Sequence, residues 1–467
     1  MGIKSFELEP TKENLLETLR TDAIGRNQYI DSFVKVCNAL DINCSIAIDA
    51  RWGAGKTFFV KQTKLVLDAH NPNIKDLLDE EKVTVKNTFG SFTDKTSGDT
   101  ILQPQVCVYY DAWANDNDAD PLLSLVYEII STTATEYSFE KKFDLKEILK
   151  MAGHIASLFT GFNSDSFEKL LTSEDPLTEI KAQKDIHKQI ANFFESLLPE
   201  KGNRLVVFID ELDRCRPGFA VKLLERIKHY FSNKKITFVF SVNIEELQHT
   251  IKKYYGNDFD ACRYLDRFFD FRIELPPANM EKYYRTIGVT DVMHYYELVC
   301  RAVIKKYRFE MREIGKYYRI VDFTVGNAID RNGMRTFTGE DTAFQFGLSY
   351  IVPIMLGLRM YDVKLYDEFI NGKNSAPMID ILTDKDIDFT AFRSLLFQGE
   401  AYKQDSGQVK VVRLEDKLQL AYEAVFVKPD SIYNNETHIG SCRFTRYTRT
   451  RLLSVASMLS GLTKFDS

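Results

Sequence analysis

The stretch Cys44-Ser-Ile-Ala-Ile-Asp-Ala-Arg-Trp-Gly-Ala-Gly-Lys-Thr57 decides the fold of this chain. Its first half is an apolar run that predicts a short buried strand, and its second half is a glycine-rich turn before a helical pattern over 56–69. Residues 50–57 fit the pattern G-x-x-x-x-G-K-[ST] except at the first position, where Ala50 replaces glycine. A strand, a glycine-rich loop and a helix in this order predict a P-loop, and they argue against a chance Gly-Lys-Thr.

Each residue type in this loop has a physical role. Glycines let backbone N–H groups approach phosphate oxygens that a side chain would obstruct, and the amino end of the following helix adds partial positive charge. We expect Lys56 to contact the β- and γ-phosphates and Thr57 to offer its hydroxyl to Mg²⁺. The predicted nucleotide-binding residues of the loop and first helical turn are Trp52, Gly53, Ala54, Gly55, Lys56, Thr57 and Phe58.

Apolar runs and helical patterns alternate along the first 278 residues. The other predicted strands cover 106–110, 204–209, 236–242 and 271–275, and the other predicted helices cover 27–40, 121–132, 219–232 and 245–255. This alternation predicts an α/β fold in three layers, with a mostly parallel five-stranded sheet. Polar residues predict an exposed insertion over 71–105, and helical spacing predicts a second insertion over 139–200.

A second motif ends the strand Leu205-Val-Val-Phe-Ile-Asp-Glu211. An apolar strand that ends in two acids is the Walker B arrangement, in which Asp210 would hold Mg²⁺ through its water shell. Glu211 would orient or deprotonate the attacking water. The alternative is a solvated turn, which the upstream P-loop disfavours.

Two further candidates each have an ordinary alternative. Asn243 ends the fourth strand, where a polar side chain can sense the γ-phosphate, but it also suits the N-cap of the next helix. Arg267 and Arg263 are four residues apart and can share a helix face, from which an arginine could reach a neighbouring subunit's phosphate. The alternative is that both pair with surface acids such as Asp266 or Asp270.

The residue composition of the chain changes near residue 278. Aromatic and charged residues at helical spacing predict a helical region over 279–375, and 376–467 is expected to be mainly helical with a short strand at 409–413. Near the end, arginines alternate with aromatics, which permits binding of single-stranded nucleic acid but more often marks a solvated helix or a protein-contact face. These residues are Arg443, Arg446, Arg449, Arg451, Phe444 and Tyr447.

Bulk properties narrow the class of protein. A length of 467 residues predicts two or three domains, and a net charge of −6 argues against a surface that is wholly a nucleic-acid footprint. Seven scattered cysteines without C-x-x-C spacing favour reduced thiols. The longest apolar stretch, 346–358, contains Pro353 and is shorter than the roughly 20 residues that span a bilayer, so we expect a cytoplasmic protein without a membrane span.

Three segments resemble the KAP family of P-loop NTPases, within the additional-strand class that includes the STAND ATPases. They are the tryptophan-containing loop 51–57, Tyr109-Tyr-Asp-Ala-Trp113 with 115–122, and Phe208-Ile-Asp-Glu-Leu-Asp-Arg-Cys-Arg-Pro217. The likeness covers 22–278, and more loosely 340–372, which resembles a helical lid. Ala50 departs from the family's glycine. Many members carry membrane helices between the two Walker motifs, whereas the insertion here has a soluble composition.

The resemblance implies ATP and Mg²⁺ as cofactors, and it implies that Arg26 borders the adenine pocket. It also implies a homo-oligomer, a separate effector partner and a role in bacterial defence against phage. No effector motif is visible in the sequence. A nucleic-acid-dependent sensor or motor, a non-hydrolysing nucleotide-binding scaffold and a small-molecule kinase are the alternatives.

Overall fold

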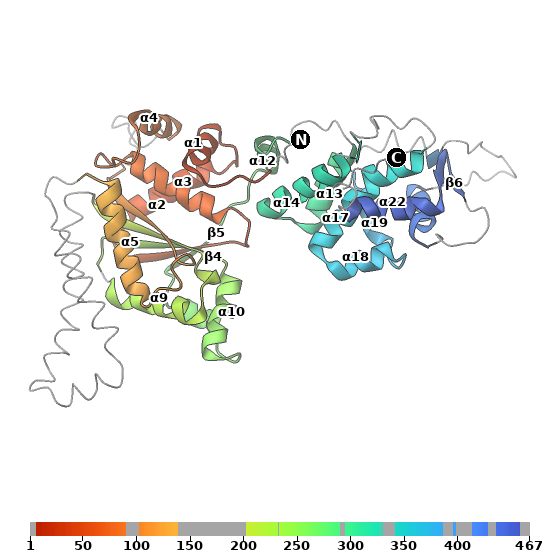
Figure 1. Cartoon of the computed structure of the whole chain (residues 1–467). Helices are drawn as coiled ribbons and strands as arrows, with labels where there is room; N and C mark the ends of the chain where they lie inside the picture. The colour runs from red at the N-terminus through yellow and green to blue at the C-terminus, as the bar shows by residue number, and fades with distance from the viewer. Residues whose placement is uncertain are drawn as a thin grey trace, which may run out of the picture. The chain divides into compact units, whose positions relative to one another are not determined.

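A computed structural model describes residues 6–89, 102–138, 202–231, 233–289, 295–326, 328–329, 341–385, 396–397, 413–427 and 436–457. The chain divides into two compact units, Leu8–Thr286 and Ile287–Ser467, and the first seven residues belong with the second unit (Figure 1). The first unit therefore extends a few residues beyond the boundary expected near 278, through helix α12 (Met280–Thr286). The predicted insertion over 139–200 and most of the predicted strand at 409–413 lie outside the described residues.

The first unit is built on a sheet of five parallel strands in the order β2-β3-β4-β1-β5. All five strands were predicted from apolar runs, and the α/β fold class is confirmed. The strand β4 lies between the strand that precedes the P-loop and the strand that carries Asp210. The bounds are β1 Cys44–Asp49, β2 Gln105–Asp111, β3 Arg204–Asp210, β4 Ile236–Val242 and β5 Phe271–Glu274.

Burial follows the position of each strand in the sheet. Every residue of β3 and β4 is buried, because helices cover both faces and strands lie on both sides. The strand register aligns Asp49 with Val242, Ser241 with Asp210, and Asp210 with Asp111. The carboxyl ends of four strands therefore meet at one edge of the sheet, where ligands bind in open α/β sheets.

Helices form the outer layers of this unit (Figure 1). Helices α1, α2 and α4 contact α3, while α9 contacts both α5 and α10. Their bounds are α1 Lys12–Thr21, α2 Asn27–Ala39, α3 Lys56–Ala69, α4 Asp79–Thr88, α5 Pro121–Glu136, α9 Pro217–Tyr230, α10 Ile244–Tyr255 and α11 Ala261–Leu265.

Helix α4 lies within the polar, exposed insertion expected over 71–105, where no helix was predicted. It is polar and buries only Val85, so it has almost no apolar periodicity for a sequence pattern to reveal. Its first turn contains three acids, which suit the positive end of a helix, and the Glu81 carboxylate accepts a hydrogen bond from the Leu78 N–H at 2.8 Å.

A buried polar network fixes the far end of helix α3 against β2. Lys64 donates to the carboxylates of Asp68 and Glu136 at 2.7 and 2.6 Å. The Tyr137 hydroxyl donates to the other Asp68 oxygen at 2.6 Å and accepts the Cys107 N–H at 2.8 Å. Because α3 begins at Lys56, this network holds the helix on which the predicted phosphate site is built.

The second unit is mainly helical, as predicted. Among the described residues, Thr342–Tyr361 is the helix long and apolar enough to cross a bilayer, and 89% of it is buried inside the protein. Burial of this kind is typical of a core helix. Two glycines allow neighbouring side chains to pack closely against this helix. A Cβ at Gly347 would lie 2.5 Å from Leu452, and one at Gly357 would lie 2.3 Å from Val303.

Other elements of the second unit surround this core helix, which comprises α16 (Thr342–Phe346), the π-helical turn η4 (Gly347–Ile351) and α17 (Val352–Tyr361). A small antiparallel hairpin, β6–β7, was not predicted. The remaining bounds are α13 Tyr295–Tyr307, α14 Met311–Val321, η3 Asp322–Gly326, α18 Val363–Ile370, α19 Ala376–Leu382, α21 Leu414–Tyr422, η5 Glu423–Val427, β6 Thr437–Ile439, β7 Cys442–Phe444 and α22 Arg446–Ala456.

Candidate nucleotide site

The loop between β1 and α3 has the backbone conformation of an anion cradle. Gly53 and Gly55 have φ angles of 87° and 86°, a left-handed conformation that favours glycine. No side chain caps the amino end of α3, so its first N–H groups are available to an anion. Ala50 has no positive φ, and the replacement of the usual leading glycine therefore causes no backbone strain.

Lys56 is buried at the start of α3, with 8% of its surface exposed. Its ammonium donates to the carbonyls of Ala50 and Arg51 at 2.8 and 3.2 Å, so it lies folded against the loop. Burial lowers the pKa of Lys56, and the carboxylates of Asp213, Asp210 and Glu211 oppose that shift. A buried cation at a glycine-rich loop is suited to phosphate binding, and the three acids favour its charged form.

Asp210 is fully buried at the end of β3 and joins two other elements. One carboxylate oxygen accepts the Thr57 hydroxyl at 2.7 Å and the Tyr109 hydroxyl at 2.9 Å. The other oxygen accepts the N–H of Glu211 at 3.0 Å. Burial and the Asp210 charge raise the pKa of Tyr109, so this phenol remains protonated and continues to donate.

Glu211 follows Asp210 in a left-handed backbone conformation, with φ of 59° and ψ of 25°. Such a conformation is uncommon for a residue other than glycine and is enriched at functional sites. Its carboxylate lies 2.6 Å from the guanidinium of Arg214. Burial raises the pKa of Glu211, the neighbouring Asp210 adds to that shift, and Arg214 counteracts it. A carboxyl whose pKa lies above the usual range is better matched to proton transfer near neutral pH.

The donor set fits Mg²⁺ bound together with a nucleotide. Thr57 and Asp210 already place a hydroxyl and a carboxylate oxygen 2.7 Å apart. Among the described residues, no group of three or more histidines, cysteines or acids forms a cage for a metal ion. Mg²⁺ commonly keeps several waters and takes only one or two protein ligands beside phosphate oxygens, so Thr57 and Asp210 are the residues that would hold it.

Asn243 lies beside the P-loop, since the Ala50 N–H donates to the carbonyl of the preceding Val242 at 3.2 Å. The Asn243 oxygen accepts the N–H of Glu246 at 3.4 Å and thus caps α10. An amide carries separate donors and acceptors, so capping by the oxygen leaves the NH₂ group available to a phosphate. The two interpretations of this residue are therefore compatible. The neighbouring Ser241 hydroxyl is buried, and no described residue forms a hydrogen bond with it.

Other predicted binding residues have different environments. Arg26 is buried and donates to the carbonyls of Ala54 and Pro276, at 3.0 and 2.7 Å, so it ties the P-loop to the chain after β5. Phe58 is also buried, which leaves its backbone N–H as the group that could contact phosphate. Trp52 is 43% exposed, and its indole N–H donates to Asp213.

Arg263 and Arg267 do not share a helix face, because α11 ends at Leu265 and Arg267 lies in the following turn. Both are exposed. The acids proposed as their surface partners are engaged elsewhere: Asp266 pairs with Arg272 at 2.8 Å, and Asp270 accepts the Ser45 N–H at 2.8 Å. Neither arginine has an ion-pair partner in the part of the chain that the structure describes.

Four residues of the site were not singled out from the sequence. Tyr109 binds Asp210, Asp213 binds Trp52, and Arg214 binds Glu211 beside Trp113. All four lie within the segments 109–113 and 208–217 that carry the family resemblance. Apart from the Arg214–Glu211 pair, their contacts join chain segments that are far apart in sequence, which spacing alone does not reveal.

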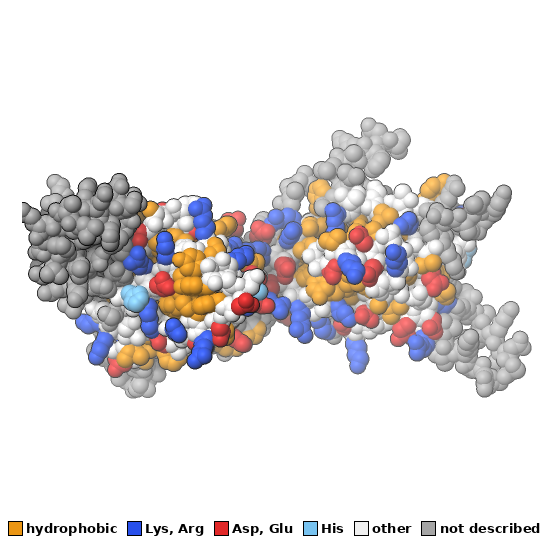
Figure 2. Space-filling view, turned by 90° about the horizontal axis from the view of Figure 1, so that it is seen from below, with side chains coloured by type: hydrophobic (Ala, Val, Ile, Leu, Met, Phe, Trp, Pro, Cys, Tyr) orange, Lys and Arg blue, Asp and Glu red, His pale blue; other side chains and the backbone are white. Residues whose placement is uncertain are grey.

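The carboxyl-terminal arginines make contacts within their own unit. Arg449 donates to the Ile370 carbonyl at 3.2 Å, and Arg451 pairs with Asp341 and lies 3.6 Å from the Phe344 ring centroid. Phe444 is buried, whereas Tyr447 is exposed. Arg443 pairs with Glu436, and the side chain of Arg446 lies outside the described residues. On the described face in Figure 2, basic and acidic side chains are interspersed, without the basic band that a nucleic-acid groove would have.

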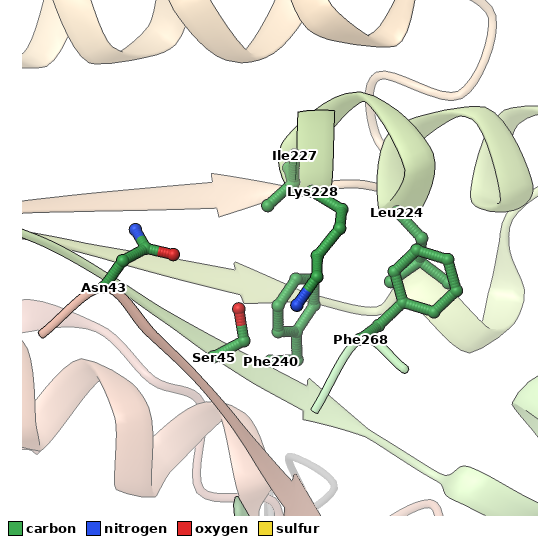
Figure 3. A pocket seen from close by; sticks show the side chains of 7 residues that line it. All are labelled: Asn43, Ser45, Leu224, Ile227, Lys228, Phe240 and Phe268. Carbon is green, nitrogen blue, oxygen red and sulfur yellow. The ribbon is translucent and has the colours of Figure 1, made fainter. Parts of the chain in front are cut away.

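A small cavity lies at the opposite edge of the sheet, where β1 begins (Figure 3). It is lined by residues including Asn43, Ser45, Lys228 and Phe268 and has a volume of about 10 Å³. That volume admits about one water molecule, so this cavity is not a nucleotide pocket.

The P-loop, the Asp210–Glu211 pair and a central strand between them define a P-loop NTPase of the additional-strand class. The chain belongs to the KAP family: the KAP family P-loop domain matches residues 26–288, more than half of the chain. One similar solved structure is the ORC2 protein of Aeropyrum pernix (ADPNP-ADP complexes), at 12% identity and a TM-score of 0.31. That match covers 66% of this chain and 64% of the other. No curated protein matches the chain.

Proposed function

We propose that this protein is a Mg²⁺-dependent ATPase that converts ATP to ADP and phosphate. The observation that carries the proposal is the joined geometry of the two motifs: Asp210 bonds the P-loop hydroxyl of Thr57 while the adjacent Glu211 remains a separate carboxylate. A binding-only site needs no second acid at this position. Glu211 supports hydrolysis because a carboxylate there can orient water and accept its proton.

Other residues have supporting roles in this proposal. The Gly53–Gly55 loop and the first N–H groups of α3 would hold the phosphates, and Lys56 would exchange its carbonyl partners for phosphate oxygens. Mg²⁺ supplies neutralisation of the charge that develops on the phosphates. Asn243, which directly follows β4, would donate to the γ-phosphate, and Tyr109 would restrain Asp210 through its hydroxyl.

The direct test is phosphate release by the purified full-length protein. We expect saturable turnover with ATP and Mg²⁺, loss of turnover with excess EDTA, and recovery when Mg²⁺ is restored. GTP is the comparator, because no residue described here identifies the base. Nucleotide binding without phosphate release, at every protein concentration tried, would instead support a non-hydrolysing scaffold.

We also propose that the active form is a homo-oligomer in which Arg267 contacts the nucleotide of a neighbouring subunit. Phe268 lies with Ser45 at the beginning of β1, whereas the P-loop follows Asp49 at its end. That separation along the strand is about 13 Å, more than one arginine side chain spans from its own backbone. Arg267 is exposed and has no ion-pair partner among the described residues, which supports a contact in trans that would stabilise transition-state charge.

Mixing two inactive variants tests this arrangement. Arg267→Ala and Lys56→Ala should each lose turnover, by at least about 10-fold, since each removes a charge from the same composite site. Mixed together, they should recover turnover, because the intact P-loop of one can face the intact Arg267 of the other. Wild-type turnover in Arg267→Ala alone would rule out the trans contact.

A further inference from the structure

Both tryptophans of the chain lie against the same cation. The guanidinium carbon of Arg214 is 5.6 Å from the Trp52 ring centroid and 5.4 Å from that of Trp113. Trp52 belongs to the P-loop, Trp113 follows β2, and Arg214 ends the short helix η2 (Leu212–Arg214) after β3. Three separate loops at the carboxyl edge of the sheet therefore converge on Arg214.

The same guanidinium is bound to the proposed catalytic acid. Arg214 Nε lies 2.6 Å from Glu211 Oε2, and both side chains are largely buried, at 22% and 17% exposure. A charge-assisted bond at this distance restricts both partners, because its strength depends on direction as well as separation. Contact with two aromatic faces further restricts the arginine. The position of Glu211 is thus coupled to both indoles.

Trp52 makes a second contact with the same short helix. Its indole N–H donates to Asp213 Oδ2 at 2.5 Å, while the Thr250 hydroxyl donates to the Asp213 carbonyl at 3.2 Å. Trp52 therefore contacts two consecutive residues, one through its N–H and one through its ring face. Any rearrangement of the P-loop around phosphate would be transmitted through Trp52 to the residues that hold Glu211.

The charged groups around Glu211 show why its contact with Arg214 matters. The groups that face Glu211 are the acids Asp210 and Asp213 and the cations Arg214 and Lys56. Of the two cations, Arg214 bonds the Glu211 carboxylate, at 2.6 Å, whereas Lys56 bonds the loop carbonyl of Ala50. Removal of Arg214 would leave the Glu211 carboxylate beside two acids without the bond that fixes its direction.

We infer that Arg214 is the positioning residue for Glu211, and that Trp52 and Trp113 hold Arg214 in place and link it to the P-loop. This inference rests on the proposed hydrolytic function. It makes the tryptophan pair an internal reporter of the geometry around the catalytic acid, because the chain has no tryptophan elsewhere.

The kinetic experiment compares Arg214→Gln with Arg216→Gln. Arg216 lies two residues away, is exposed and binds Asp116 and Asn117 rather than Glu211. We expect Arg214→Gln to lower kcat by about 10- to 100-fold with a nearly unchanged KM, because Glu211 loses its fixed position while the phosphate-binding loop keeps its own contacts. Arg214→Lys should restore kcat in part, because the charge returns without the planar guanidinium. Arg216→Gln should resemble wild type.

Tryptophan fluorescence tests the same contacts in the absence of ATP hydrolysis. Tryptophan emission should change in Arg214→Gln and stay unchanged in Arg216→Gln, both without nucleotide. In the wild type it should change when ADP or a non-hydrolysable ATP analogue fills the P-loop. The variants Trp52→Phe and Trp113→Phe assign the signal to each ring, and circular dichroism confirms that each variant is folded.

The possible results separate the inference from the function on which it rests. No turnover by the wild type under any condition would overturn the hydrolytic proposal, and with it the role of Arg214 in positioning. Turnover by the wild type together with an unchanged kcat in Arg214→Gln would overturn the inference alone. Equal losses in kcat, nucleotide binding and thermal stability would likewise overturn it, since they would indicate a purely structural residue.

Discussion

Replacing Glu211 with Gln is expected to reduce phosphate release by at least about 100-fold while ATP binding persists, because general base catalysis typically contributes that much or more. The substitution keeps the shape of the side chain and removes its ability to accept a proton. Lys56, Thr57 and Asp210 keep their contacts, since none of them bonds the Glu211 carboxylate. Single-turnover phosphate release measures the loss, and titration with a fluorescent ATP analogue measures binding.

Glu245→Gln is the matched control for this variant. Glu245 is an exposed acid in the first turn of α10 and has no contact with the P-loop among the described residues. In the wild type, turnover should fall at acid pH, because the raised pKa of Glu211 brings its protonation into a higher pH range than that of an ordinary glutamate. Glu211→Gln with wild-type turnover would show that another group activates the water.

Replacing Lys56 with Ala is expected to weaken nucleotide binding by about 10- to 100-fold, because a hydrogen bond to a charged group contributes about 1.5–3 kcal/mol. Lys56 is the buried cation of the P-loop, and no other lysine or arginine bonds the loop carbonyls of Ala50 and Arg51 within the described structure. Calorimetric titration with ATP and Mg²⁺ measures the effect. Unchanged affinity in a folded Lys56→Ala protein would contradict the assignment of this loop.

Lys35→Ala provides the control, since Lys35 is exposed on α2 and pairs with Asp31. Lys56→Ala also allows a cellular check of the defence role and the separate effector that the family resemblance implies. If the nucleotide cycle controls that effector, bacteria that carry the wild type should resist phage plating and those that carry Lys56→Ala should not.

The strands and the P-loop could be predicted because each leaves a strong local pattern. A strand buried on both faces is a continuous apolar run, and β3 and β4 are buried at every residue. Helix α4 could not be predicted in this way, because its one buried residue leaves no periodicity. The β6–β7 hairpin is too short, at three residues a strand, to stand out from its surroundings.

The candidate site was predictable for residues whose role depends on neighbours in the chain. Lys56 follows the glycine loop directly, and Glu211 follows Asp210. The role of Arg214 depends instead on Trp52 and Trp113, which come from distant loops and meet it only after the sheet has formed. Ala50 illustrates the converse: it looks like a defect in the motif, yet its backbone conformation does not require glycine.

The buried helix Thr342–Tyr361 has a consequence for how this protein is made. It leaves the ribosome before α22, although α22 packs against α16, η4 and α17, and Leu452 of α22 closes over Gly347. Its apolar surface, hydrophobic enough to resemble a membrane segment, therefore remains without its final cover until nearly a hundred further residues have been synthesised. During translation the apolar surface of this helix is therefore open to chaperones and to aggregation.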